Sequence, residues 1–519
     1  MPRFGAIDIG SNALRLAIVE AESPSKAREL TTQRAAVRLG REVFTQGRIA
    51  PSAISQASEA LRKFRELLDE HRVDRYRAVA TSAVREAENG GLFVERARRE
   101  AGIDLDVIEG MEEARLVRLA LVGRLDLRTQ RALLVDLGGG STELSLIEGG
   151  TLRAARSLPV GSVRLLEAFL GGGVVDREKA QLAREYVERQ LREAPAEIRA
   201  GAFDVVVGTG GNFETLAQLC PAPPPPRDDD PSRDSRRPPP IAYPTIDVAA
   251  VRALLPRLAS MAPDERRAAY GMRPDRADVI VAAGAIVLEI AGALRIDRIS
   301  APGIGLREGV LDELVEKHFE VWDYGGEAVA AVEASLRLGR RYQFDEAHGA
   351  LVARIATDLF DQLRPQHRLS ERDRLLLHVA AILHDVGDFI RYEGHHRHSQ
   401  YIIQNSDIVG LSPRERTLVA ALARYHRKSP PDASHPGFRE LDRDDRSRVR
   451  VLASILRLAD ALDREHLGKV SAVRAVPEKG KLRLHVTGAA DRQLEEWTVM
   501  RKAAMFEEVF DLKVEIARS

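Results

Sequence analysis

The chain has 519 residues, which is too many for one compact core, so two or three domains are expected. Lys+Arg and Asp+Glu both number 78, and this balance gives no general attraction to nucleic acid or to an acidic membrane, so neither is expected as a partner. The single cysteine, Cys220, excludes an intramolecular disulfide framework and fits a reducing compartment, which predicts a cytoplasmic location.

An internal repeat stands at the start of the chain. RFGAIDIGSNALRLAIVE, beginning at Arg3, aligns without a gap with RALLVDLGGGSTELSLIE, beginning at Arg131, so that Asp8 matches Asp136. Each copy has an apolar strand, a turn of small residues opening with Asp, and a second strand of alternating pattern. The repeat predicts two copies of a glycine-turn hairpin.

Alternating strand and helix patterns follow each hairpin. Strands are predicted at 76–80 and 107–109, and helices at 53–70 and 93–102. The most apolar stretch, 279–288, is too short to cross a bilayer and is better explained as a core helix.

Two changes in composition mark boundaries. Residues 221–244 combine a proline tract with a charge run and predict a surface insertion. Near Tyr324, two glycines precede an almost strand-free helical region that runs to about Asp463. Strands around 470–486, a helix over 491–510 and a short strand, VEIA, are predicted after it. The expected domains are 1–125, 126–315 with the insertion, 325–465 and 466–519.

Three glycine-rich turns could hold phosphate, because only very small side chains let backbone N–H groups approach an anion closely. One such turn alone would be an ordinary hairpin turn, but three are more than turns require. The candidate phosphate-binding residues are Gly10, Ser11 and Asn12; Gly138, Gly139, Gly140 and Ser141; and Gly208, Thr209, Gly210 and Gly211.

Carboxylates accompany these turns. Asp8 and Asp136 end the first strand of each hairpin, where they could hold Mg²⁺ or its waters against phosphate, or simply cap the turn. Glu143 alternates with apolar residues of its strand and could face either the cleft or solvent.

Seven ordered motifs resemble the exopolyphosphatase and guanosine pentaphosphatase family. They are DIGSN, TSAVREAEN, GMEEARL, VDLGGGSTELS, LPVGSVRL, GTGGNFETLA and APGIGLREGVL, and they cover roughly residues 1 to 315. HRHSQYIIQNSD and ARYHRKS extend the resemblance into the C-terminal half. Ala301 stands where the family usually has Ser, and Asn212 where Thr is common, which puts the fine contacts of the last two motifs in doubt.

The resemblance implies two ribonuclease-H-like α/β domains of the actin and acetate-kinase type. A mostly α-helical HD-like domain and a small α+β C-terminal segment would follow them. It further implies hydrolysis of terminal phosphates with Mg²⁺ or Mn²⁺, with Glu113 as the base that activates water. Arg85 would bind the transferring phosphoryl group, and Asp136 and Glu143 would lie in the phosphate and metal loop. In-line phosphoryl transfer needs such positioning, neutralisation and a carboxylate to orient water.

The helical region contains histidines and aspartates in an order that resembles the HD phosphohydrolases. His348, His384, Asp385 and Asp460 would bind one divalent metal, and His398 and His426 could bind a second. Two other interpretations remain open. Individual histidines often serve as caps or buried hydrogen-bond partners. Alternatively, a basic track for polyphosphate could be formed by His395, His396, Arg397, His398, Arg424, Arg427 and Lys428.

The leading functional hypothesis is an exopolyphosphatase, and the nearest alternative acts on guanosine pentaphosphate. A kinase or actin-like assembly protein would need an acceptor-binding domain or filament surface, for which no motif is found. A further class is a phosphate or nucleotide sensor with catalysis in the HD region. By analogy with long family members, a homodimer is expected.

Overall fold

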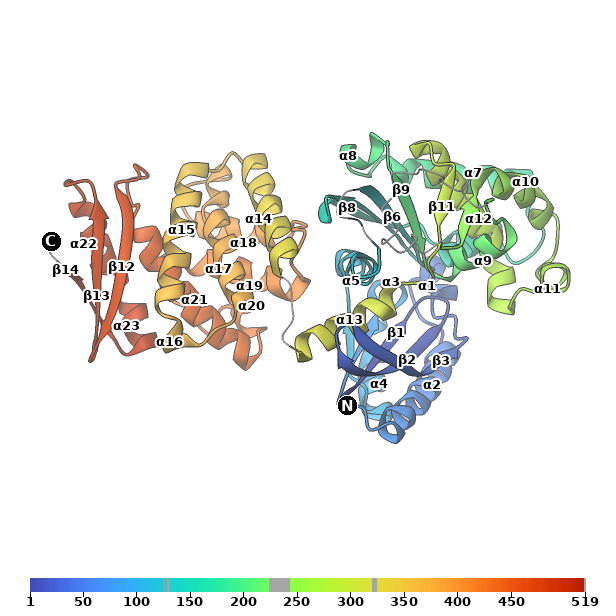
Figure 1. Cartoon of the computed structure of the whole chain (residues 1–519), viewed down its shortest axis with the longest axis horizontal. Coiled ribbons are helices and arrows are strands. Elements are labelled where there is room, and N and C mark those ends of the chain that lie inside the picture. The colour runs from blue at the N-terminus through green and yellow to red at the C-terminus, as the bar shows by residue number, and fades with distance from the viewer. Residues whose placement is uncertain (126, 128–129, 224–242, 320–323, 518–519) are drawn as a thin grey trace, which may run out of the picture. The chain divides into compact units, whose positions relative to one another are not determined.

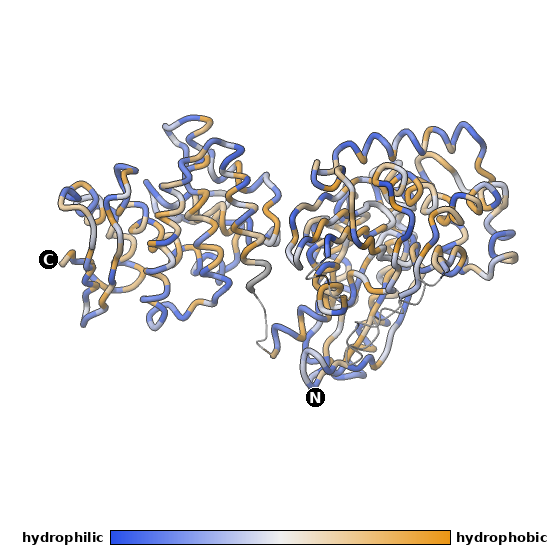
Figure 2. Tube along the Cα trace, turned by 45° about the horizontal axis from the view of Figure 1, so that its top comes forward, coloured by the Kyte–Doolittle hydropathy of each residue, from blue (hydrophilic) through white to orange (hydrophobic). Residues whose placement is uncertain are grey.

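The computed structural model describes residues 1–125, 127, 130–223, 243–319 and 324–517 (Figure 1). Its contacts divide the chain into two compact units, Met1–Trp322 and Asp323–Ser519. Most of the predicted insertion, residues 224–242, lies outside the described residues. Figure 2 shows that the apolar segments lie mainly in the interior of each unit and the hydrophilic segments mainly at its surface.

Unit 1 begins with an α/β lobe whose five-stranded sheet has the order β3-β2-β1-β4-β5. The strands are β1 (Arg3–Ile9), β2 (Leu14–Ser23), β3 (Lys26–Ala35), β4 (Arg75–Ala80) and β5 (Leu105–Val107). The helices are α1 (Gly40–Gln46), α2 (Pro51–Glu70), α3 (Ser82–Glu86), α4 (Gly90–Ala101) and α5 (Gly110–Val122). The strand predicted at 107–109 is shifted, because the chain turns toward α5 after Ile108, whose N–H still donates to Ala80.

The second lobe repeats this topology around a six-stranded sheet, β10-β11-β9-β6-β7-β8. Its strands are β6 (Arg131–Leu137), β7 (Thr142–Glu148), β8 (Thr151–Leu158), β9 (Val205–Thr209), β10 (Thr245–Asp247) and β11 (Arg298–Ser300). Its helical elements are α6 (Ser162–Leu165), the π-helical turn η1 (Leu166–Leu170), α7 (Arg177–Leu191), α8 (Ala196–Arg199), α9 (Gly211–Leu219), α10 (Val248–Ala259), α11 (Pro263–Tyr270) and α12 (Pro274–Leu294).

Both predicted hairpins are present and take the same register. In the first, β1 pairs antiparallel with β2, so that Asp8 lies opposite Arg15; in the second, Asp136 lies opposite Glu143. In each lobe the first strand also pairs in parallel with a later strand, β4 or β9. Three antiparallel strands joined to parallel ones, made twice, confirm the predicted duplicated α/β fold.

Helix α12 is the core helix predicted from the apolar run at 279–288. It is long and apolar enough to cross a membrane, with a mean hydropathy of 2.0, yet 67% of that apolar window is buried inside unit 1. It packs against α7, α10 and α11. Burial on several sides explains why apolar residues surround the helix rather than forming one stripe.

The last helix of unit 1, α13 (Leu306–His318), returns to the first lobe, where it packs on α5, β1 and β2. The end of the region expected to form the second domain, residues 306–315, therefore lies against the first lobe. Buried ion pairs fix this contact. Arg115 of α5 donates to Glu313 of α13 at 2.6 Å, and Arg77 of β4 donates to the same carboxylate at 2.7 Å. Helix α5 also contacts β7 and β8, so it touches both lobes.

Unit 2 is mainly helical, as predicted, and ends in the three-stranded sheet β12-β13-β14. Its helices are α14 (Tyr324–Arg341), α15 (Glu346–Gln362), α16 (Arg364–His367), α17 (Glu371–Leu383), the 3₁₀ turn η2 (Val386–Phe389), α18 (His395–Gln404), α19 (Pro413–Tyr425), α20 (Pro436–Arg439) and α21 (Arg443–Ala461). The C-terminal elements are β12 (Val470–Glu478), β13 (Lys481–Gly488), α22 (Gln493–Lys502), α23 (Ala504–Phe510) and β14 (Lys513–Ala517). The single helix predicted over 491–510 is two helices, both packed on α21.

Candidate active site

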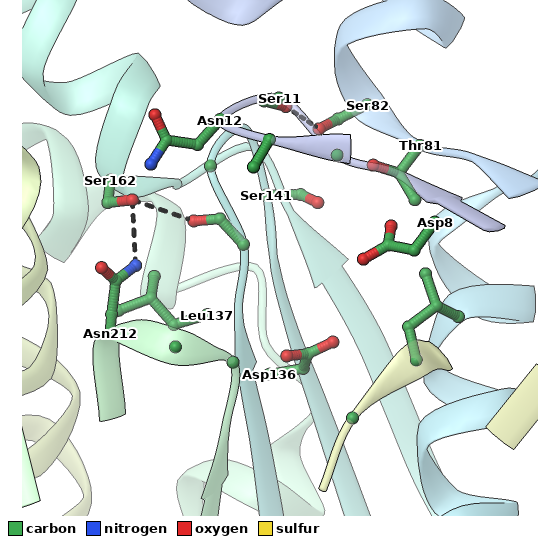
Figure 3. Close-up of a pocket in the computed structure, with 18 of the residues that line it drawn as sticks. Asp8, Ser11, Asn12, Thr81, Ser82, Asp136, Leu137, Ser141, Ser162 and Asn212 are labelled. Atoms are coloured by element: carbon green, nitrogen blue, oxygen red, sulfur yellow. Dashed lines mark hydrogen bonds between the residues drawn. The ribbon is translucent and has the colours of Figure 1, made fainter. Parts of the chain in front are cut away.

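The turns of the two hairpins face one another across a cavity of about 90 Å³ in unit 1. Figure 3 shows Asp8 above Asp136 in this view, with Ser11, Ser82 and Ser141 higher still. Of the predicted phosphate-binding residues, those that line the cavity are Gly10, Ser11, Asn12, Gly138, Gly139, Ser141, Gly210 and Gly211.

Small residues let the two hairpin turns approach each other. A Cβ added to Gly139 would lie 2.8 Å from Ser11 Cβ, and one added to Gly140 would lie 2.4 Å from the Ser82 hydroxyl. The Ser11 and Ser82 hydroxyls are themselves hydrogen-bonded at 3.0 Å (Figure 3). Gly140 is absent from the cavity lining, so its role here is to permit this packing.

The third predicted loop is only partly a loop: its first two residues belong to strand β9, and its last two line the cavity. Gly208 lies inside β9, where a Cβ would lie 2.3 Å from the Phe213 ring, so packing explains this glycine. Thr209 donates to Asp136 Oδ1 at 2.8 Å. Gly210 has φ +91°, a left-handed conformation that favours glycine, and it carries the chain from β9 into α9.

Three carboxylates converge beside the second hairpin. One oxygen from each of Glu113, Asp136 and Glu143 lies within 4.8 Å of the other two. All three side chains are buried, and Glu113 Oε2 and Glu143 Oε2 have no hydrogen-bond partner in the part of the chain that the structure describes. Buried carboxylate oxygens without donors fit a hard divalent cation such as Mg²⁺ or Mn²⁺.

Asp8, predicted as a ligand of the same metal, is placed differently. Its Oδ2 lies 3.6 Å from Arg15 Nη1, and it is outside the group of three carboxylates. Glu113, predicted only as a base, takes its place in the group.

Burial and mutual repulsion raise the pKa values of the acidic residues. Burial raises the pKa of Glu143 to about 8, with a further contribution from Asp136, and raises the pKa of Asp136 to about 6 against the hydrogen bond from Thr209. The pKa of Glu113 is raised well above its ordinary value by burial, then by Glu143 and Asp136, while Arg85 opposes the rise. A carboxylate with a raised pKa is a stronger base toward water.

Arg85 lies near this group but is turned toward the start of α5. Its Nη1 donates to the Ile108 carbonyl at 2.5 Å, and its Nε is 3.7 Å from Glu109. It is not among the residues lining the cavity. Its electrostatic effect reaches both Glu113 and Glu143, whose pKa values it lowers.

Sequence reasoning missed Arg276, a cavity residue from the first turn of α12. This buried guanidinium donates to Asn212 Oδ1 at 3.1 Å, and the Asn212 amide donates to the Ser162 hydroxyl at 3.0 Å (Figure 3). Burial lowers the pKa of Arg276 to about 10, and the nearby Arg15 adds to this. Its only signal in the sequence is weak: it is the second of two arginines, after Arg273, that stand just before the apolar run.

A second cavity of about 240 Å³ adjoins the first and shares Arg15, Gly210, Gly305 and Leu306 with it. Three further arginines line it: Arg34, Arg273 and Arg307. No aromatic residue lines either cavity among the described residues. Carboxylates outnumber arginines in the lining of the first cavity, and arginines outnumber the two glutamates, Glu214 and Glu308, in that of the second.

Unit 2 gathers the predicted histidine and aspartate residues into one cluster. His348, His384 and Asp460 form one close group, and His384, Asp385 and His426 form another. His395, not His398, completes the cluster, because its Nε2 lies 3.0 Å from Asp385 Oδ1. His398 is half-buried against Gly387, and within the described ranges no hydrogen bond or ion pair joins it to the cluster.

The predicted basic track is only partly continuous. His395, Arg427 and Lys428 line a cavity of about 860 Å³ in front of the cluster. Arg397 and Arg424 are not part of that lining, and Arg424 instead donates to Gln400 at 2.8 Å. His396 is buried beside His395, and burial lowers its pKa to about 4.

Comparison with known sequences relates both units to one family. A model of the Ppx/GppA phosphatase family matches residues 18–318, and a model of Ppx/GppA phosphatase, domain III, matches residues 332–502. A guanosine-5'-triphosphate,3'-diphosphate pyrophosphatase of Aeromonas hydrophila is 28% identical over 422 residues, which are 81% of this chain and 80% of that protein.

Two solved structures are similar to unit 1 in sequence. An exopolyphosphatase from Cytophaga hutchinsonii is 26% identical, with a TM-score of 0.53 over 61% of this chain and 98% of that one. A Ppx/GppA family member from Aquifex aeolicus is 29% identical, with a TM-score of 0.48 over 61% of this chain and 98% of that one.

Proposed function

Because the chain belongs to the Ppx/GppA phosphatase family and is a phosphoanhydride hydrolase, we propose that it releases orthophosphate from the ends of inorganic polyphosphate. The observation that carries this proposal is the pair of joined cavities. One is lined by the glycine turns and by Glu113 and Asp136, two members of the carboxylate group, and the other is lined by arginines without an aromatic side chain.

The terminal phosphate sits among the turns of the two hairpins, where small residues allow close approach of the backbone. Glu113 takes the proton from the attacking water, since it is buried, has an unpartnered oxygen and has a raised pKa. The water oxygen bonds to the terminal phosphorus while the bridging P–O bond breaks. The shortened chain leaves with the bridging oxygen.

Asp136 and Glu143, with one oxygen of Glu113 within 4.8 Å of an oxygen of each, would hold Mg²⁺. A bound cation there supplies neutralisation of the phosphate charge during transfer. The chain's own cations act on the other side. Arg15 borders both cavities, and Arg34, Arg273 and Arg307 line the second, so a linear polyanion would meet guanidinium groups beyond its terminal phosphate. Arg34 and Arg307 are paired with Asp275 and Glu308, and phosphate would compete with these carboxylates.

Guanosine pentaphosphate is the second candidate substrate, because the Aeromonas hydrophila relative is named for a reaction on that nucleotide. The same loops would hold its terminal phosphate. Its guanine base would then lie at or beyond the second cavity. Neither cavity has an aromatic side chain in its lining on which the base could stack.

Orthophosphate release with Mg²⁺ tests the proposal, comparing long-chain polyphosphate with guanosine pentaphosphate at equal concentrations of terminal phosphate. Glu113→Gln should lower the rate on polyphosphate by roughly 10²–10⁴-fold, whereas the exposed Glu95→Gln should not change it. A higher kcat/KM for guanosine pentaphosphate would transfer the proposal to the second candidate. Undiminished activity in Glu113→Gln would refute the assignment of the base.

A further inference from the structure

Four histidines of unit 2 are held in one tautomer by partners outside the cluster. The Nδ1 atoms of His384 and His426 lie 2.7 Å from the carbonyls of Ala381 and Ala423. A carbonyl only accepts, so each Nδ1 carries the hydrogen. His348 Nδ1 lies 2.8 Å from Asp463 Oδ2, and His395 Nδ1 lies 3.0 Å from the Tyr392 carbonyl and 2.5 Å from Asp388.

The opposite nitrogens therefore present lone pairs toward one another. His348 Nε2 and His384 Nε2 are 3.2 Å apart, and His395 Nε2 and His426 Nε2 are 3.4 Å apart. Two acceptors at such distances repel unless a cation lies between or beside them. The second pair already has the guanidinium of Arg427, whose Nη1 lies 3.2 Å from His395 Nε2, and the first pair has no arginine or lysine hydrogen-bonded to either Nε2 among the described residues. Orientation of imidazoles by outer partners is also the usual arrangement around protein-bound metals.

Asp385 joins the two histidine pairs through different oxygens. Its Oδ2 faces His348 and His384 at 3.8 and 3.5 Å, while its Oδ1 faces His395 and His426 at 3.0 and 3.3 Å. Asp460 Oδ1 completes the first group, at 3.6 Å from His384 Nε2. The donors thus form two adjacent sets that share one carboxylate.

The wall in front of these sets comes from helix α22 of the C-terminal segment. Trp497 is 55% exposed, and the Arg501 guanidinium lies over its ring at 4.6 Å from the centroid. Lys502, from the same helix, contacts Asp460 Oδ2 and leaves Oδ1 toward the histidines. Arg427, Lys428 and Arg464 line the remainder of the 860 Å³ cavity.

We propose that unit 2 is a second, separate phosphohydrolase site, which binds two transition-metal ions bridged by Asp385 and hydrolyses nucleoside phosphates. Mixed imidazole and carboxylate donors favour Mn, Fe, Co or Zn. Trp497 stacks on the base, and the lysines and arginines hold the phosphates. Water adds across a P–O bond: its oxygen bonds to phosphorus, the bond to the leaving oxygen breaks, and the leaving oxygen takes up the proton. This inference does not depend on the function proposed for unit 1.

Metal content tests the site without activity. After loading with Mn²⁺ and dialysis, Asp385→Asn should hold about two ions fewer per chain than the wild type, and His426→Gln about one fewer. Asp444→Asn, a change at an exposed carboxylate of the same unit, should match the wild type. Thermal unfolding of each metal-free variant shows that the fold is retained. Equal Mn²⁺ content in Asp385→Asn and Asp444→Asn would overturn the proposal.

Activity is measured in Glu113→Gln, so that unit 1 does not contribute. With Mn²⁺, this variant should release phosphate from at least one of ATP, GTP, AMP and GMP, and Asp385→Asn added to it should abolish the release. Trp497→Ala should raise KM for that nucleotide roughly 10-fold or more, whereas Tyr401→Ala, at another exposed aromatic, should not. Release from none of the four, release that survives Asp385→Asn, or an unchanged KM in Trp497→Ala would each overturn the proposal.

Discussion

At the scale of the residue, the carboxylates of unit 1 make its stability depend on pH. Glu143 and Asp136 have pKa values raised to about 8 and about 6, so the folded chain binds protons more tightly than the unfolded chain. Without divalent metal, the stability they contribute is fully present below their ordinary pKa values of 4.5 and 3.8 and is lost as pH rises through the raised values. We expect the melting temperature of unit 1 to fall between about pH 4 and about pH 8.

Added Mg²⁺ should restore more stability at the upper end of this range, where the carboxylates would otherwise be charged and unpaired. Glu143→Gln, which has no proton to lose, should show a shallower dependence on pH. Scanning calorimetry with and without Mg²⁺ checks both points. Parallel pH profiles for the variant and the wild type would contradict them.

A single added methyl group should test how closely the glycine turns are fitted. A Cβ on Gly161 would lie 2.4 Å from the carbonyl of Gly139, so Gly161→Ala must displace that turn. Misplacement by about 1 Å can cost about 10²-fold in rate, and we expect a loss of that order in phosphate release. Gly172→Ala, whose Cβ meets nothing within 4 Å, is the matched control and should be fully active.

At the scale of the element, α13 is held to α5 by a buried carboxylate. Burial would raise the pKa of Glu313, but Arg115, Lys317 and Arg77 lower it to about 2. Glu313→Gln leaves the buried Arg115 and the partly buried Arg77 with one charge fewer opposite them and should destabilise unit 1 by about 3–5 kcal/mol. Denaturant unfolding near neutral pH measures this, and Asp312→Asn, from a more exposed pair with Arg124, should cost about 0–1 kcal/mol.

The stability that Glu313 contributes depends on pH in the opposite direction to the stability that Asp136 and Glu143 contribute. Because its folded pKa is lowered, Glu313 contributes in full above its ordinary pKa of 4.5 and progressively less as pH falls toward about 2. The difference between wild type and Glu313→Gln should therefore shrink on acidification. A constant difference down to that pH would argue against the ion pairs as its cause.

Elements were more predictable from sequence than contacts between them. The repeat revealed both hairpins, because apolar strands around a turn of small residues have a local signature. The packing of α13 on the first lobe has no local signature in the sequence, since it depends on contacts between segments that are distant along the chain. The sequence pattern predicts His398 as the metal ligand, whereas the structure places His395 beside Asp385. Which histidine of α18 faces Asp385 depends on how α18 packs on η2, and this contact has no local signature either. Arg276 enters the site only through the placement of α12.

At the scale of the whole molecule, two compact units should unfold separately. Calorimetry should resolve two transitions, with Glu313→Gln lowering only one and Asp385→Asn changing the Mn²⁺ response of only the other. One transition that both substitutions shift together would mean that the two units behave as one cooperative body.

The two hairpins share one register but differ in charge, so the two sides of the cavity between their turns are not equivalent. The position held by Arg15 in the first copy is held by Glu143 in the second, opposite Asp8 and Asp136 respectively. The first pair is electrically neutral and the second is doubly negative when ionised. Under the proposed function, Mg²⁺ is therefore expected beside the second hairpin and the phosphate chain beside the first. The two repeated hairpins thus differ electrically through the sign of one side chain.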